Sequence, residues 1–231
     1  MTRALLFDLD DTLYAERQFV RSGFRVVAAE VETRFGVPRR EALATLVGAL
    51  RRGRRRRALQ DLCEHHVLSA GIIPDLVETI RAHTPVMRLP DSTVAVLRAA
   101  RRAGWRIGVV TNGLPAIQAR KVDALGLRQF VDVIVFADEC GAGLGKPERA
   151  GFDAALAALG MPADLAVFVG DDLRCDVFGA RRAGMRTVWM RHGAKRAGDM
   201  PGIAPDRSVT RIEDALIAAE SVLAMEVAHA A

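Results

Sequence analysis

Residues 4–12 read Ala-Leu-Leu-Phe-Asp-Leu-Asp-Asp-Thr, and this stretch decides how the rest of the chain is interpreted. Its four leading apolar residues predict a buried strand that ends in carboxylates. Carboxylates near a core cost free energy unless they are paired or used. Asp8 and Asp10 lie two positions apart, so on an extended chain they share one side of the strand. One of them could attack a substrate or hold a metal ion while the other moves a proton.

Beyond about residue 90 the chain alternates short apolar runs with helical patterns. Four runs are rich in β-branched residues and nearly continuous in apolar character: 106–111, 132–136, 165–170 and 186–190. Such runs are typical of strands that are buried on both faces of a parallel sheet. Together with the N-terminal run, they predict an α/β fold: a Rossmann-like parallel sheet of five main strands with helices on both faces.

The segment 15–87 breaks this alternation, because its apolar residues follow helical spacing and no strand pattern occurs. It predicts an α-helical cap domain inserted after the first strand, so that the core comprises residues 1–14 and 88–231. The segment holds 13 arginines and 8 acidic residues, and therefore carries the whole net charge of +5. Only three lysines occur among the 33 basic residues, so each lysine is a candidate for a specific role.

Composition excludes several classes of protein. Half of the 231 residues are hydrophobic, which indicates a globular fold. No apolar run is long enough to cross a membrane, and Asp8 interrupts the N-terminal run too early for a signal peptide. The three cysteines form no Cys-x-x-Cys pair, which is expected of a protein in a reducing cytoplasm.

Polar groups recur where the other predicted strands end. The second strand is followed by Thr111-Asn112-Gly113 and the fourth by Asp171-Asp172, with Asp176 one helical turn later. Lys146 precedes the fourth strand. In a parallel sheet these groups meet at one edge. Clustered carboxylates without histidine or cysteine suit Mg²⁺, while a hydroxyl, N–H groups and a lysine suit a phosphate. The pattern therefore predicts phosphoryl transfer with an aspartate nucleophile.

These motifs, in this order, resemble the haloacid dehalogenase-like hydrolase superfamily. The matching motifs are Asp8-x-Asp10-x-Thr12, Thr111-Asn112-Gly113, Lys146-Pro147 and Gly170-Asp171-x4-Asp176, and the resemblance covers most of residues 1–14 and 90–191. The helical insert lies where this superfamily has its smaller, α-helical (C1-type) cap. The dehalogenase and phosphonate-cleaving branches lack the second aspartate, so the presence of Asp10 makes the chain similar to the phosphatase branch.

The resemblance also implies roles for the residues. Asp8 would attack phosphorus, and Asp10 would protonate the leaving oxygen and then activate water. Mg²⁺ would be held by Asp8, the backbone carbonyl of Asp10, and Asp171. The implied phosphate ligands are Thr111, Asn112 and Lys146. Asp176 would orient Lys146 or a metal-bound water, and Asp172 is an alternative to Asp171 or Asp176.

The expected activity is thus that of a Mg²⁺-dependent phosphatase, with a small anionic cytoplasmic phosphomonoester as substrate. Sugar phosphates, nucleotides and phosphoglycolate all fit. Two alternatives remain open: a phosphomutase on the same scaffold, and a non-catalytic protein that binds an anionic partner through its basic cap. The arginine run 54–57 carries no interleaved aromatic residue, so nucleic acid is not favoured. Four cap arginines are candidates for contact with the substrate: Arg21, Arg25, Arg54 and Arg55. The sequence does not address the oligomeric state.

Overall fold

The computed structural model describes residues 2–141, 143–192 and 202–229. The chain divides into two compact units. The core unit comprises residues 1–15 and 88–231, and the cap unit comprises residues 16–87. Within the described residues, no helix combines the length and the apolar character that crossing a bilayer would require.

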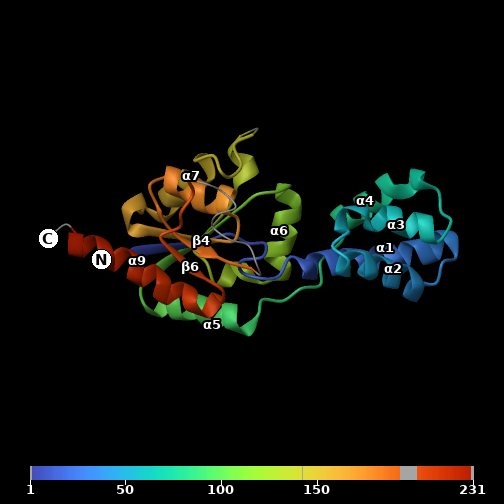
Figure 1. The fold of residues 1–231 in the computed structure, drawn as a ribbon, viewed down its shortest axis with the longest axis horizontal. Coiled ribbons are helices and arrows are strands. Elements are labelled where there is room, and N and C mark those ends of the chain that lie inside the picture. The colour runs from blue at the N-terminus through green and yellow to red at the C-terminus, as the bar shows by residue number, and fades with distance from the viewer. Residues whose placement is uncertain (1, 142, 193–201, 230–231) are drawn as a thin grey trace. The chain divides into compact units, whose positions relative to one another are not determined.

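The core unit is built on a parallel sheet (Figure 1). Its six strands lie in the order β3-β2-β1-β4-β5-β6. Their bounds are β1 Arg3–Phe7, β2 Trp105–Thr111, β3 Val133–Phe136, β4 Ala166–Gly170, β5 Arg186–Met190 and β6 Arg207–Val209. The five predicted strands are confirmed. The sixth, β6, was not expected, because three residues with two exposed side chains carry too little apolar pattern to indicate a strand.

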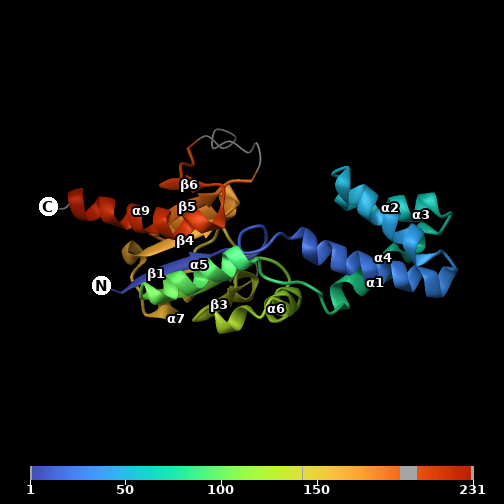
Figure 2. The same cartoon turned by 90° about the horizontal axis from the view of Figure 1, so that it is seen from below.

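Helices cover both faces of this sheet. Figures 1 and 2 show α5 and α9 side by side on one face and α7 on the other. The helices of the core unit are α5 Asp91–Arg102, α6 Pro115–Ala124, α7 Ala150–Leu159, α8 Gly179–Arg182 and α9 Ala215–His229. Shorter helical turns are η3 Leu127–Gln129, η4 Ala137–Cys140, η5 Ala163–Leu165, η6 Leu173–Phe178 and η8 Ile212–Asp214.

The apolar strands are buried, as their composition predicts. Leu6 of β1 and Phe168 of β4 pack in one cluster with Phe152 of α7. The rings of Phe152 and Phe168 meet edge to face, with centroids 5.0 Å apart. Burying side chains of this size stabilises the fold by roughly 1.5–3 kcal/mol each. The packing fixes the sheet, and with it the positions of the residues that follow each strand.

The cap unit is helical throughout. Its elements are α1 Arg17–Phe35, α2 Arg39–Arg51, η1 Arg55–Arg57, α3 Ala58–His65, η2 Ala70–Ile72 and α4 Ile73–Ala82. Phe24, Val27 and Val31 form the buried face of α1 and pack against Leu46 of α2 and Leu76 of α4. The cap unit therefore has an apolar core of its own.

Candidate active site

Three neighbouring strands place the predicted site residues at one edge of the sheet. β1 lies between β2 and β4, and all three run parallel. Asp8, Asn112 and Asp171 each directly follow one of these strands. The Asp8 N–H donates to the Val169 carbonyl at 2.9 Å, which extends the sheet pairing up to the first carboxylate.

A buried lysine joins the first and fourth motifs. Lys146 Nζ donates to Asp8 Oδ1 at 2.6 Å and to Asp176 Oδ1 at 2.7 Å. Burial alone would lower the pKa of Lys146, but the charges of Asp176 and Asp8 outweigh it and raise that pKa. The pKa of Asp8 is also raised, chiefly by burial and further by Asp176, against the opposing effect of Lys146. The Lys146 ammonium is therefore favoured in its charged form. Its charge alone does not offset the effect of burial on the Asp8 carboxylate.

Both carboxylate oxygens of Asp176 accept hydrogen bonds. It lies in η6, a turn of π-helix, and only 1% of the residue is exposed. Besides its contact with Lys146, its Oδ2 accepts the Asp172 N–H at 2.9 Å. A Cβ on Gly170 would overlap this carboxylate, so a glycine is required where β4 ends.

Carboxylates in this region match the donor set of a hard cation. One oxygen from each of Asp8, Asp171 and Asp176 lies within 4.8 Å of the others. Oxygen donors of this kind fit Mg²⁺. Because both oxygens of Asp176 already accept hydrogen bonds, the geometry favours Asp8 and Asp171 as ligands, with Asp176 in an orienting role. The Asp172 carboxylate instead caps η6, where it accepts backbone N–H groups of the following residues.

The second and third motifs are joined by a reciprocal pair of hydrogen bonds. Asn112 Nδ2 donates to the Lys146 carbonyl at 2.8 Å, and the Lys146 N–H donates to Asn112 Oδ1 at 2.7 Å. The peptide bond between Lys146 and Pro147 is cis. Asn112 thereby positions the backbone of the buried lysine. Thr111, which is 1% exposed, is the last residue of β2 and directly precedes Asn112.

Asp10 lies apart from the three-carboxylate group and has partners of its own. Lys121 Nζ donates to its Oδ1 at 2.9 Å and to its Oδ2 at 2.7 Å. Gln118 Nε2 donates to Asp10 Oδ2 at 3.0 Å and to Thr111 Oγ1 at 2.6 Å, and the Tyr14 hydroxyl donates to Asp10 Oδ1. The sequence analysis assigned no role to Lys121 or Gln118. The scarcity of lysine and the i, i+3 spacing of this pair were the available signals.

The cap arginines expected to contact the substrate differ in their surroundings. Arg21 and Arg25 are exposed on α1. Arg54 donates to Asp61 at 2.8 Å, and Arg55 forms an ion pair with Glu16. The positive charges of Arg54 and Arg55 are therefore balanced locally, which weakens the expectation that they attract an anion.

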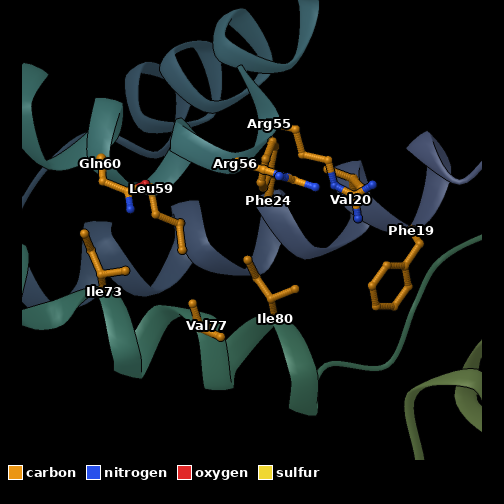
Figure 3. A pocket seen from close by; sticks show the side chains of 10 residues that line it. All are labelled: Phe19, Val20, Phe24, Arg55, Arg56, Leu59, Gln60, Ile73, Val77 and Ile80. Carbon is orange, nitrogen blue, oxygen red and sulfur yellow. The ribbon is translucent and has the colours of Figure 1, made fainter. Parts of the chain in front are cut away.

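A pocket of about 230 Å³ lies within the cap unit (Figure 3). Seven of its ten lining residues are apolar, and they come from α1, α3 and α4: Phe19, Val20, Phe24, Leu59, Ile73, Val77 and Ile80. Arg55, Arg56 and Gln60 supply its polar groups. Arg56 forms no ion pair with any residue that the structure describes. The pocket thus combines apolar walls with one guanidinium whose charge has no carboxylate beside it.

Comparisons with known proteins agree with this geometry. A phosphoserine phosphatase of Thermus thermophilus is 32% identical over 189 residues, which is 80% of this chain and 71% of the relative. A glyceraldehyde 3-phosphate phosphatase of Methanopyrus kandleri is 30% identical over 226 residues, or 90% and 94% of the two chains. The solved structure of a 2-haloacid dehalogenase from Pseudomonas syringae has a TM-score of 0.63 at 24% identity, covering 97% of this chain and 99% of that chain. That last likeness shows the fold alone, and one fold can host several chemistries.

The family model for haloacid dehalogenase-like hydrolases matches residues 2–184, which include Asp8, Lys146 and Asp176. The four motifs that predicted this fold are brought together at one edge of the sheet. The chain therefore belongs to the haloacid dehalogenase-like hydrolases and is an enzyme of that family.

Proposed function

We propose that this enzyme is a Mg²⁺-dependent phosphatase that hydrolyses a small cytoplasmic phosphomonoester through an aspartyl-phosphate. One observation carries the proposal: buried Lys146 bridges Asp8 and Asp176, and a carboxylate oxygen of Asp171 lies within 4.8 Å of theirs. Carboxylates at this density, with a single ammonium among them, suit an anionic substrate only when a cation is bound.

Asp8 is the proposed nucleophile. Its carboxylate oxygen attacks phosphorus, the P–O bond to the alcohol breaks, and the electron pair leaves with that alkoxide oxygen. Lys146, the Thr111 hydroxyl and the Asn112 N–H are the proposed ligands of the phosphoryl oxygens. Asp8, the Asp10 carbonyl and Asp171 would hold Mg²⁺, which would supply positive charge to offset the negative phosphoryl group.

Asp10 is the proposed general acid and base. It gives its proton to the leaving oxygen and then takes one from the water that hydrolyses the aspartyl-phosphate. The carboxylate is 24% exposed, so substrate and water can reach it. The presence of this second aspartate favours phosphate ester hydrolysis over dehalogenation, since halide leaves without a proton.

The relatives bear on the substrate class. Two of them are named for phosphoserine and for glyceraldehyde 3-phosphate, both small phosphorylated molecules. We extend this class, but neither compound, to the present enzyme.

Phosphate release from a panel of small phosphomonoesters, with Mg²⁺ and with a chelator, tests the proposal. We expect turnover that depends on Mg²⁺ and is lost in Asp8→Asn. The matched control is Asp164→Asn, which removes an exposed carboxylate in η5 and should retain full activity. Activity that persists with the chelator, or that survives Asp8→Asn, would refute the mechanism. Conversion of a sugar monophosphate to its isomer without phosphate release would instead identify a phosphomutase.

A further inference from the structure

Two residues of α6 converge on Asp10 from inside the core unit. Gln118 and Lys121 lie three positions apart and therefore share one face of the helix. They are 2% and 4% exposed. Burying an ammonium is costly unless it is paired, and Lys121 satisfies this requirement on both oxygens of Asp10. An amide and an ammonium are thus aimed at one carboxylate from the same helix.

The orientation of the Gln118 amide follows from its neighbours. Gln118 Nε2 donates to Asp10 Oδ2 at 3.0 Å, so the NH₂ group of Gln118 faces the carboxyl group. The same nitrogen donates to the Thr111 hydroxyl at 2.6 Å. Each of its two hydrogens therefore has one acceptor. Gln118 fixes the distance between the proposed proton carrier and a proposed phosphate ligand.

We infer that Lys121 and Gln118 are positioning residues that hold the Asp10 carboxylate in line for proton transfer. The inference rests on the proposed role of Asp10. Lys121 Nζ donates to both oxygens of Asp10, so we place its effect on Asp10 and not on the ester itself. Proton transfer requires the donor to lie within hydrogen-bond reach of the reacting oxygen, and a displacement of about 1 Å can cost a factor of about 100 in rate.

A purely structural role is the competing explanation, because the same contacts tie α6 to the loop after β1. The two explanations differ in what they predict for the leaving group. An alkoxide needs the proton from Asp10, whereas a nitrophenolate leaves without it. Misplacing Asp10 should therefore slow alkyl esters more than nitrophenyl phosphate. A general loss of structure should slow both equally.

The decisive experiment is a double-mutant cycle of Lys121→Met and Asp10→Asn, with kcat and KM measured on an alkyl phosphomonoester and on nitrophenyl phosphate. In the wild-type background, we expect Lys121→Met to lower kcat about 10- to 100-fold for the alkyl ester and less than about threefold for nitrophenyl phosphate. In the Asp10→Asn background, the same change should alter kcat less than about twofold, because the group that Lys121 positions is already lost. Arg120→Met is the control: it removes an exposed charge directly before Lys121 on α6, and its kcat and KM should match those of the wild type.

Equal losses for both esters, or a full additional loss in the Asp10→Asn background, would overturn the inference. If Lys121→Met does not fold, Gln118→Leu carries the same test, since it removes one donor and keeps the ion pair between Lys121 and Asp10. Failure of the proposed function gives a different result. In that case Asp10→Asn alone would show no dependence on the leaving group, whatever Lys121→Met does.

Discussion

Replacing Asp8 with asparagine should abolish turnover and stabilise the protein when no divalent cation is bound. Asp8 is 8% exposed and shares Lys146 with Asp176, so two carboxylates compete for one ammonium. Burial, and then Asp176, raise the pKa of Asp8 to about 8 from an ordinary value of 3.8. The amide oxygen of the new asparagine would still accept the hydrogen bond from Lys146, while the unfavourable charge would be gone.

The sign of the pH dependence follows from this raised pKa. A carboxyl whose pKa is higher in the folded state binds its proton more tightly there, so wild-type stability falls as pH rises from about 4 towards the raised value of about 8. The advantage of Asp8→Asn should therefore be small at pH 5 and largest near pH 8. One unit of pKa shift is worth about 1.4 kcal/mol. Relief of part of this shift predicts a gain on the order of a few kcal/mol.

Thermal unfolding at several pH values, in a chelator and in excess Mg²⁺, measures this prediction. For a chain of this length, about 1 kcal/mol corresponds to roughly 2–4 °C in Tm. With excess Mg²⁺ the difference in Tm between Asp8→Asn and wild type should shrink or change sign, since the wild type binds the cation more tightly and is stabilised by mass action. An Asp8→Asn protein less stable than wild type at pH 8 without metal, or an advantage that shrinks with rising pH, would refute the reasoning.

Two further outcomes are expected. Asp10→Asn should slow formation of the phosphoenzyme most for alkyl esters, while its hydrolysis slows for every ester; equal effects on formation in pre-steady-state kinetics would exclude Asp10 as the general acid. Gly170→Ala should lower kcat more than about tenfold, because the new Cβ overlaps the Asp176 carboxylate; wild-type kinetics would show that Asp176 can move at no cost.

The sheet could be predicted from the sequence because its strands are nearly continuous apolar runs. Leu6 and Phe168 are buried on a parallel sheet, and this environment leaves a clear signal in composition. The short strand β6 leaves no such signal, since its pairing is imposed by its neighbour β5. Tertiary context, not local pattern, makes those three residues a strand.

The site could be predicted in part for the same reason. Asp8 and Asp171 follow strands, and topology alone brings strand ends together. How deeply Asp8 is buried could not be predicted: it is 8% exposed and accepts a hydrogen bond from Lys146. Pairing between residues 138 positions apart depends on how a loop folds, which periodicity does not encode.

The two described lysines connect composition with the chemistry of the site. The cap unit alone carries 13 arginines, yet both lysines that the structure describes, Lys121 and Lys146, are buried in the core unit beside the proposed catalytic aspartates. An ammonium is a compact charge with three donors that can point in different directions, so it fits between two carboxylates or onto both oxygens of one. A guanidinium is planar and larger, and its fixed fork matches the two oxygens of one carboxylate, as Arg55 does with Glu16. Among the described residues, arginines such as Arg55 form exposed ion pairs, whereas Lys121 and Lys146 are buried cations that each contact a proposed catalytic aspartate.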